Sequence, residues 1–192
     1  VQDTAIMRAT PGMRVVDPCD ESELRSCLRA VIDYQGPVYL RLTRDAWPDV
    51  TPQGYRFQFG KACLLREGSD LAIIAGGPLV SESLKAARDL EGRGVKTRVI
   101  NMSSIKPLDE ATVEQAARDC GAIVVAENHT IYGGLGAAVA EVVCERYPVP
   151  VVRVGIQDVL AESGHNAELL AKYHLDAPAI LKAAERALAM KR

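Results

Sequence analysis

The chain has 192 residues, of which 48% are hydrophobic and 25% charged, and its formal net charge is -2. This profile is typical of an ordinary soluble globular protein and gives no sign of a nucleic-acid or membrane partner. The longest apolar runs are far shorter than the roughly 20 residues that a membrane span needs. Because no secretory signal is visible and the five cysteines are widely spaced, we expect reduced thiols and a cytoplasmic protein.

Strands alternate with helices along the chain, which predicts a three-layer α/β/α fold with a mostly parallel sheet. The expected strands are 13–17, 38–43, 71–75, 97–102, 122–126 and 149–155, with an alternating, hairpin-like segment at 55–60 and a loop at 127–132. The expected helices run from Asp20 to a stop at Gly36-Pro37, around Val80–Ala87, and over 109–120, 133–143, 167–173 and 178–190.

The first of these helices has a clear start. Asp20 stands where a helix N-cap belongs, and Glu23 follows three residues later, as in a capping box. Leu24, Leu28 and Val31 then recur at the spacing of one helical face. The sequence therefore predicts a capped amphipathic helix with these three residues on its apolar side.

The stretch 45–54 is polar and contains two prolines, and neither helical nor strand periodicity continues through it. Such stretches usually join domains. We therefore predict a domain remnant at 1–50, a linker at 51–57 and a second domain at 58–192. Because the chain opens on Val1 and runs directly into structured-looking sequence, we expect it to be part of a longer protein.

Several residues at the ends of strands are candidates for chemistry. The glycine-rich turn 133–136 lacks the spacing of a dinucleotide fingerprint, so we expect a tight turn with close packing. Glu127 and His129 lie at the edge where open α/β sheets present functional groups. Two roles stay open for them: ordering a loop, or contacting another domain or subunit. His165 and His174 lack a partner nucleophile or metal-ligand spacing, so we expect them at the surface or at an interface.

Arg44 ends the predicted strand 38–43, so its guanidinium would project from the carboxyl edge of a sheet. Arginine suits a bidentate grip on a phosphate or a carboxylate, although a salt bridge between domains is equally open. We find no serine, cysteine or carboxylate constellation that forms a self-sufficient catalytic site. The residues themselves therefore predict no catalytic and no metal-binding side chain.

Beyond these patterns, the chain resembles the transketolase family over nearly its whole length. Segment 1–20 is similar to the part of the family's pyrimidine-binding domain in which a helix leads to a strand and a P-x-D turn, and segment 36–44 ends in Leu-Thr-Arg like that domain's final strand. The family's C-terminal domain is matched in order by Phe59-Gly-Lys-Ala, Asp70-Leu-Ala-Ile-Ile-Ala-Gly-Gly, Val99-Ile-Asn-Met-Ser-Ser-Ile-Lys-Pro-Leu-Asp, Glu127-Asn-His and Gly133-Gly-Leu-Gly-Ala-Ala-Val-Ala-Glu.

The resemblance implies a thiamine-diphosphate-dependent transketolase of pentose phosphate metabolism, which transfers a two-carbon ketol unit between sugar phosphates. It looks most like the split form, in which a separate N-terminal subunit carries the diphosphate-binding domain. Arg44 matches the family arginine that holds the substrate's phosphate. The family's contacts to the cofactor and to Mg²⁺ belong mainly upstream of Val1, so this chain alone should be inactive. A homodimer is expected, without nucleic acid or membrane.

Relatives that share the C-terminal domain leave alternatives. One is the beta subunit of a 2-oxoacid dehydrogenase, and another is a deoxyxylulose-phosphate synthase. A third hypothesis is that the chain is not part of an enzyme and is a non-catalytic dimerisation or regulatory module. The start Met7-Arg-Ala-Thr-Pro-Gly-Met13 and the Leu-Thr-Arg strand end favour transketolase among the enzymes.

Overall fold

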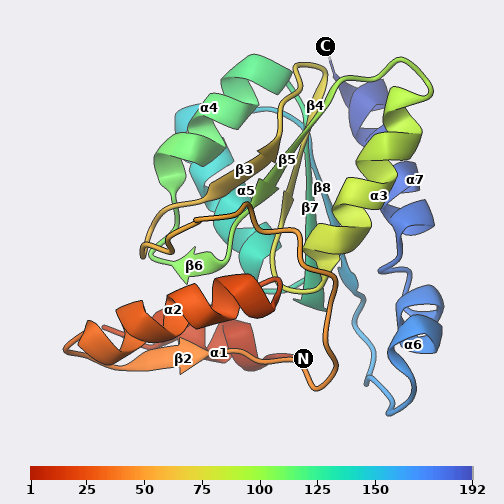
Figure 1. The fold of residues 1–192 in the computed structure, drawn as a ribbon. Helices are drawn as coiled ribbons and strands as arrows, with labels where there is room; N and C mark the ends of the chain where they lie inside the picture. Colours follow the sequence, from red (N-terminus) through yellow and green to blue (C-terminus); the bar gives the residue numbers. More distant parts are fainter. Residues whose placement is uncertain (192) are drawn as a thin grey trace.

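The computed structural model describes residues 1–191 (Figure 1). Its elements in chain order are α1 (Asp3–Ala9), β1 (Arg14–Val16), α2 (Glu21–Asp33), β2 (Val38–Leu40), β3 (Cys63–Arg66), β4 (Leu71–Ala75), α3 (Leu79–Glu91), β5 (Thr97–Asn101), β6 (Ser104–Lys106), α4 (Glu110–Cys120), β7 (Ile123–Thr130), α5 (Leu135–Arg146), β8 (Val151–Ile156), α6 (Asn166–Lys172) and α7 (Ala177–Met190). Over the described residues, no helix has the length and apolarity needed to cross a membrane.

A five-stranded sheet in the order β3-β5-β4-β7-β8 forms the middle layer. β5, β4, β7 and β8 run parallel, and β3 joins the β5 edge antiparallel. Helices α3 and α7 cover one face, whereas α4 and α5 cover the other (Figure 1). The predicted three-layer α/β/α fold is therefore confirmed.

The central strand shows why the sequence folds this way. Every residue of β4 is fully buried, because a parallel strand with helices on both faces has no side toward water. Leu71 and Ile73 face α3 and α7, while Ala72 and Ile74 face α4 and α5. An uninterrupted apolar run thus fills two cores at once, since successive side chains of a strand point to opposite faces.

A second, smaller sheet connects the start of the chain to the rest. Its order is β2-β1-β6, with β1 parallel to β2 and antiparallel to β6. Since β6 follows β5 directly, the N-terminal segment lies across the carboxyl ends of the main strands (Figure 1). Glu127 and His129 lie at this junction.

Helix α2 begins as predicted but turns a different face inward. The Asp20 carboxylate accepts a hydrogen bond from the N–H of Glu23 at 2.8 Å, which confirms the N-cap. The fully buried residues are Glu23 and Cys27, whereas Leu28 is 42% exposed. The predicted apolar face was therefore wrong, because the polar bonds made by Glu23 fix the rotation of the helix.

Three local predictions were also wrong. Regular strand structure ends at Leu40 instead of continuing over 38–43, since β2 pairs only with the short β1. Residues 127–130 continue β7 instead of forming a loop, because Thr130 pairs with Ile156 of β8 after a register shift. The segment 55–60 forms no hairpin.

In that last segment, the N–H of Phe57 donates to the Ser26 hydroxyl at 2.8 Å instead of to a partner strand. The Phe57 ring packs with Val16 and Cys27 in a small cluster under α2. The alternating aromatic pattern therefore reflects anchoring of a loop on a helix. The short strands β3 and β6 were not predicted, since both depend on antiparallel partners distant in sequence.

Candidate functional site

Buried polar groups meet where the N-terminal segment crosses the carboxyl ends of β4, β5 and β7. Asp17 follows β1 directly; its N–H donates to the Ser103 carbonyl at 2.9 Å, and its own carbonyl accepts from the N–H of Gly77 at 3.1 Å. Gly77 has φ of 54°, and a Cβ there would lie 2.7 Å from the Asp17 carboxylate. Glycine is required at this contact both for its backbone conformation and for space.

Arg41 follows β2 and holds two carboxylates. Its Nε donates to Asp3 at 2.7 Å, and its Nη1 lies 3.4 Å from Asp17. The hydroxyl of Tyr39 donates to the same Asp3 oxygen at 2.8 Å. Burial opposes ionisation of Asp3, but the bond and charge of Arg41 together with Tyr39 lower its pKa below the usual range. Burial raises the pKa of Asp17 to about 6 in spite of Arg41.

A second buried carboxylate attaches α2 to β5. Glu23 is fully buried and accepts hydrogen bonds from the Cys19 N–H at 2.8 Å, the Asn101 amide at 2.9 Å and the Ser103 hydroxyl at 2.7 Å. Three donors satisfy most of the acceptor capacity of the carboxylate, which makes its burial tolerable. The N-terminal segment is thus joined to the main sheet through polar side chains as well as through β6.

Glu127 lies near the end of β7 and faces the start of α5. Its two carboxylate oxygens accept from the N–H groups of Leu135 at 2.7 Å and Gly136 at 2.9 Å. These are donors that a helix N-terminus leaves without intrahelical partners, and the helix dipole favours a negative charge there. Burial nevertheless dominates and raises the pKa of Glu127 to about 7.

His129 contacts the N-terminal segment directly. Its Nδ1 lies 2.7 Å from the Thr130 carbonyl, and its Nε2 accepts from the N–H of Ala5 at 3.3 Å. The ring is therefore neutral with the proton on Nδ1, and burial lowers its pKa in agreement with that form. His129 therefore links the first helix, α1, to the end of β7.

The glycine-rich turn before α5 accommodates both contacts. A Cβ on Gly133 would lie 2.8 Å from the Ala5 Cβ, and a Cβ on Gly134 would lie 2.7 Å from Nδ1 of His129 and would overlap the Glu127 carboxylate. The turn is therefore tight and closely packed, as predicted. No phosphate needs to be invoked to explain these glycines.

Arg44 lies in the loop after β2, exposed, beside a hollow of about 290 Å³. The hollow is lined by the turn from β1 into α2 and by residues 41–47 and Asp49. Within residues 1–191 the Arg44 guanidinium makes no hydrogen bond or ion pair, so it is available to an oxyanion. The structure does not join Arg44 to Glu127 or His129 directly; Arg41 lines the hollow and also reaches the buried cluster.

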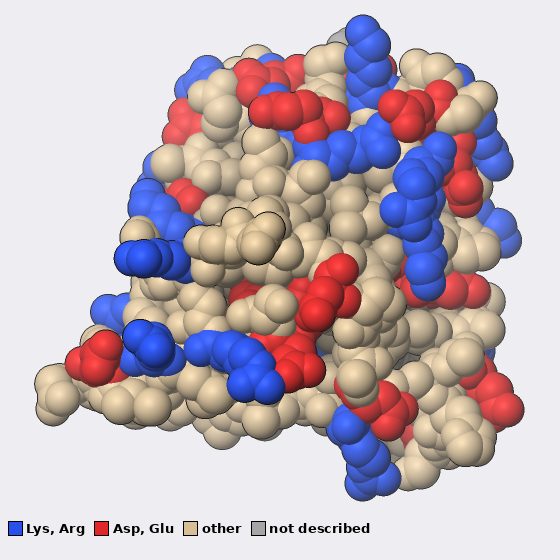
Figure 2. Space-filling model, viewed as in Figure 1, with Lys and Arg blue, Asp and Glu red and all other residues tan. Residues whose placement is uncertain are grey.

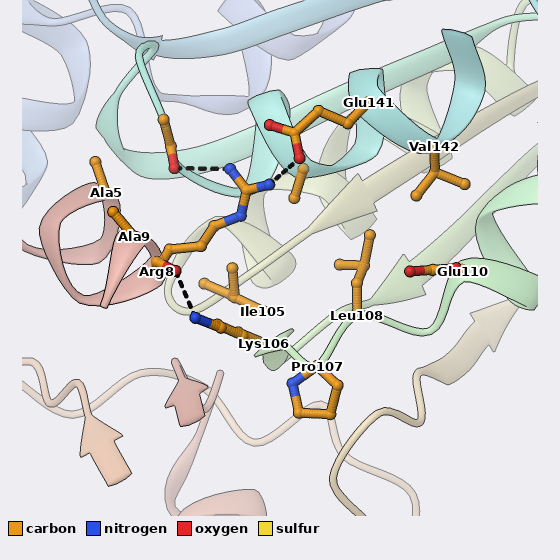
Figure 3. A pocket seen from close by; sticks show the side chains of 12 residues that line it. Ala5, Arg8, Ala9, Ile105, Lys106, Pro107, Leu108, Glu110, Glu141 and Val142 are labelled. Carbon is orange, nitrogen blue, oxygen red and sulfur yellow. Dashed lines mark hydrogen bonds and ion pairs between the residues drawn. The ribbon is translucent and has the colours of Figure 1, made fainter. Parts of the chain in front are cut away.

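A larger hollow of about 470 Å³ lies between α1, α5 and the segment after β6 (Figure 3). Its cations are already bound: Arg8 donates to the Gly133 carbonyl and pairs with Glu141, and Lys106 donates to the Arg8 and Thr10 carbonyls at 2.7 Å. Its remaining lining is largely apolar. It therefore offers no free charge to a polar ligand, in contrast to the hollow at Arg44.

Two further observations limit the chemistry. Across the face drawn in Figure 2, basic and acidic side chains alternate without a large field of one sign. Among residues 1–191, no group of three or more His, Cys, Asp or Glu is arranged to hold a metal ion. His165 and His174 are exposed, as expected.

Sequence reasoning missed Asp3, Asp17, Glu23 and Arg41. An acidic residue directly after a buried strand was a usable signal for Asp17, since such positions lie at the carboxyl edge of the sheet. Glu23 was recognised only as a capping residue. Its burial depends on Asn101 and Ser103, about eighty residues away in the chain, and no local pattern reveals that.

Comparisons with known proteins agree with this architecture. Residues 60–180 match the family model described as "Transketolase, C-terminal domain", and residues 1–49 match "Transketolase, pyrimidine binding domain". The fold and these matches define the chain as an α/β protein that joins a piece of a pyrimidine-binding domain to a C-terminal domain of the transketolase type. The chain belongs to the transketolase family.

Individual relatives are similar over almost all of the chain. The 6-deoxy-6-sulfo-D-fructose transketolase subunit SqwH of Clostridium sp. (strain MSTE9) is 42% identical over 184 residues, covering 96% of this chain and 57% of the relative. The 1-deoxy-D-xylulose-5-phosphate synthase 1 of Geobacter sulfurreducens is 40% identical over 195 residues, covering 100% of this chain and 31% of the relative. The chain thus spans little more than half of the first relative's length.

Among solved structures, one described as "Split gene transketolase, inactive beta4 tetramer" superposes with a TM-score of 0.97 at 43% identity. The match covers 100% of this chain and 63% of that one. The likeness therefore includes the N-terminal segment and its placement on the sheet.

Proposed function

We propose that this chain is the C-terminal portion of a split-type, thiamine-diphosphate-dependent transketolase, which transfers a two-carbon ketol unit between sugar phosphates. The observation that carries the proposal is the likeness to the split-gene transketolase over the whole chain. In this proposal residues 1–50 complete a pyrimidine-binding domain, 51–57 form the linker, and 58–192 are the C-terminal domain.

Arg44 is the substrate-binding residue of the proposal. Its free guanidinium suits a tetrahedral oxyanion, such as the terminal phosphate of a sugar. The Clostridium relative is named for 6-deoxy-6-sulfo-D-fructose, whose sulfo group is an oxyanion of similar shape. The same hollow carries Asp20, Glu21, Asp45 and Asp49, so it is a poor anion site by itself. Tight binding of the substrate phosphate then requires further hydrogen-bond donors from other parts of the enzyme.

Thiamine diphosphate supplies the carbanion chemistry in such an enzyme. We propose that its diphosphate and Mg²⁺ are held by residues outside this chain, since residues 1–191 present no cluster of metal ligands. This chain contributes Arg44 to the substrate site, and it completes the domain against which the cofactor lies. By itself the chain is then inactive.

Glu127 and His129 have an indirect role in this proposal, at a domain contact. His129 receives the N–H of Ala5, and Glu127 fixes the turn on which α1 rests. Together they hold the pyrimidine-domain piece on the C-terminal domain.

The proposed partners are an N-terminal, diphosphate-binding subunit and a second copy of this chain. Support comes from the superposed split-gene structure, which is described as a beta4 tetramer and is therefore a related chain that self-associates. We also propose a cytoplasmic location, because all five cysteines are free thiols and four of them are buried.

The test is a ketol-transfer assay on the full-length protein, with thiamine diphosphate, Mg²⁺ and xylulose 5-phosphate, alone and mixed with its candidate diphosphate-binding partner. We expect turnover in the mixture only. Arg44→Ala should raise KM roughly 10- to 100-fold through the lost charge-assisted hydrogen bonds, with a smaller effect on kcat. Arg29→Ala, which removes an exposed arginine of α2, serves as the control.

The competing function is deoxyxylulose-phosphate synthesis, favoured by the synthase relative that matches the whole chain. The same mixture assayed for 1-deoxy-D-xylulose 5-phosphate separates the two. Formation of that product without ketol transfer would replace the proposal, and absence of both activities would favour a 2-oxoacid dehydrogenase subunit or a non-catalytic module.

A further inference from the structure

The loop after β2, which carries Arg44, is fixed at its start by Arg41. The N–H of Arg41 donates to the Val16 carbonyl at 2.8 Å, so pairing with β1 continues one residue beyond β2. Two carboxylates hold the guanidinium of Arg41, and this side chain is only 12% exposed. Beyond this anchor, no backbone N–H of residues 42–46 donates to a backbone carbonyl within residues 1–191. The conformation of the loop further along therefore depends on side-chain contacts.

The far end of the loop is attached to helix α6 of the C-terminal domain. The side-chain amide of Asn166, the first residue of α6, donates to the Asp45 carboxylate at 2.8 Å. Trp47 lines the hollow at Arg44 and also a second hollow of about 170 Å³, whose wall includes apolar side chains of α6. The loop that carries Arg44 thus reaches a helix 121 positions away in the chain.

The bond between Asn166 and Asp45 bears directly on Arg44, because Asp45 is the next residue in the chain. A hydrogen bond to an ionised carboxylate is stronger than one between neutral groups. Fixing a loop before its ligand arrives reduces the conformational entropy lost on binding and so raises the affinity. The amide also engages the carboxylate nearest to Arg44 in sequence, which would otherwise be free to pair with that guanidinium in place of an anionic substrate.

We propose that Asn166 is a positioning residue for substrate binding. It holds Asp45, and it thereby fixes the loop from which Arg44 meets the phosphate of the sugar. The inference rests on the proposed function, since it takes Arg44 as the phosphate-binding residue. It gives the C-terminal domain a part in substrate affinity, although Asn166 itself touches no substrate.

The first test measures KM for xylulose 5-phosphate with the full-length protein and its N-terminal partner. Asn166→Asp places two carboxylates opposite each other, so we expect KM to rise about 3- to 10-fold with kcat changed less than about twofold. In an Asp45→Asn background the same substitution restores a donor and an acceptor with exchanged roles, so KM should change less than about twofold. Ala167→Asp adds the same charge at an exposed position of α6 and is the matched control.

A second comparison asks whether Asn166 acts through Arg44. In an Arg44→Ala background, Asn166→Asp should change KM less than about twofold, because the side chain that the loop positions is already absent. Trp47 is the single tryptophan of the chain, and its fluorescence reports the loop without any assay of activity. Assigned by difference with Trp47→Phe, the emission should move to longer wavelength in Asn166→Asp and return when Asp45→Asn is added.

Several results would overturn the proposal. An equal rise in KM with and without Asp45→Asn, or an equal rise in Ala167→Asp, would mean that charge near the site acts without the bond. Unchanged Trp47 emission in Asn166→Asp would mean that α6 does not hold the loop. A parent protein without ketol transfer would contradict the proposed function instead, and the fluorescence comparison alone would then decide whether Asn166 fixes the loop.

Discussion

Glu127 combines two opposing influences on one carboxyl group. Two backbone N–H groups and a helix N-terminus favour its charged form, while burial favours the neutral form and raises its pKa from 4.5 to about 7. The folded protein therefore holds this proton more tightly than the unfolded chain does. The stabilisation is complete below pH 4.5 and is lost as the pH rises through about 7.

We therefore expect the free energy of unfolding to fall between pH 5 and pH 8, with Glu127 contributing roughly 3 kcal/mol of that fall. Glu127→Gln cannot ionise, so its stability should depend less on pH. Some dependence remains, because burial also raises the pKa of Asp17 to about 6. Urea unfolding of both proteins at several pH values measures this. Parallel curves would mean that the two N–H groups keep Glu127 charged throughout.

Gly134 is a residue whose identity is set by its neighbours. A Cβ there would overlap the Glu127 carboxylate and lie 2.7 Å from Nδ1 of His129, and both partners are buried. We expect Gly134→Ala to destabilise the protein by at least about 2 kcal/mol, because neither neighbour can move without breaking a hydrogen bond.

The matched control for this substitution is Gly92→Ala. Gly92 has φ of -58°, and an added Cβ would meet only ordinary contacts from 3.4 Å outward. Alanine is favoured over glycine in helical backbone, so this variant should be neutral or slightly stabilising. Equal melting temperatures for the two variants would show that the turn at Gly134 adapts freely.

At the scale of elements, α2 is held on β5 by one buried carboxylate. Glu23→Ala would leave the Cys19 N–H, the Asn101 amide and the Ser103 hydroxyl without their acceptor. Buried donors without partners are costly, so we expect a loss of about 3 kcal/mol in chemical unfolding. Glu21→Ala on the same helix removes only an exposed pair with Arg25 and should cost less than about 1 kcal/mol. If Glu23→Ala and Glu21→Ala lowered the free energy of unfolding by similar amounts, the cause would be a general weakening of α2 and not the loss of the buried hydrogen bonds.

The contrast between α2 and β4 shows what the sequence could predict. Residues 71–75 are buried on both faces, so apolarity alone defined the strand to the residue. The Asp20 cap is equally local and was predicted correctly. The buried face of α2 was not, because it depends on a polar network with β5 that no helical period records.

The candidate site divides in the same way. Glu127 and His129 could be named from their places near the end of β7, which is a property of the local sequence, whereas Arg44 lies in a loop four residues after β2 ends. The two carboxylates bound by Arg41 could not, because their meeting depends on how the N-terminal segment crosses the sheet. The place of a residue along a strand can thus be predicted from the sequence. Its contacts with residues distant in the chain can be identified only from the fold.

At the scale of the whole molecule, the N-terminal segment and the C-terminal domain are interlocked. β6 pairs with β1 across the proposed boundary, and Glu23 and Asp17 add buried hydrogen bonds from the first segment to β5 and the residues after it. The covalent connection between the two parts, in contrast, runs through an exposed stretch at 52–54. The parts should therefore need that connection little once they are folded.

We expect the full chain to survive a cut there. With a site for a specific protease inserted between Pro52 and Gln53, the nicked protein should elute from a sizing column as one species and separate only in denaturant. Its unfolding transition should move down, since the second part no longer benefits from a high effective concentration of the first. Dissociation in native buffer would mean that the buried bonds around Glu23 and Asp17 are too weak to hold the parts together. The linker would then be a structural requirement of the fold.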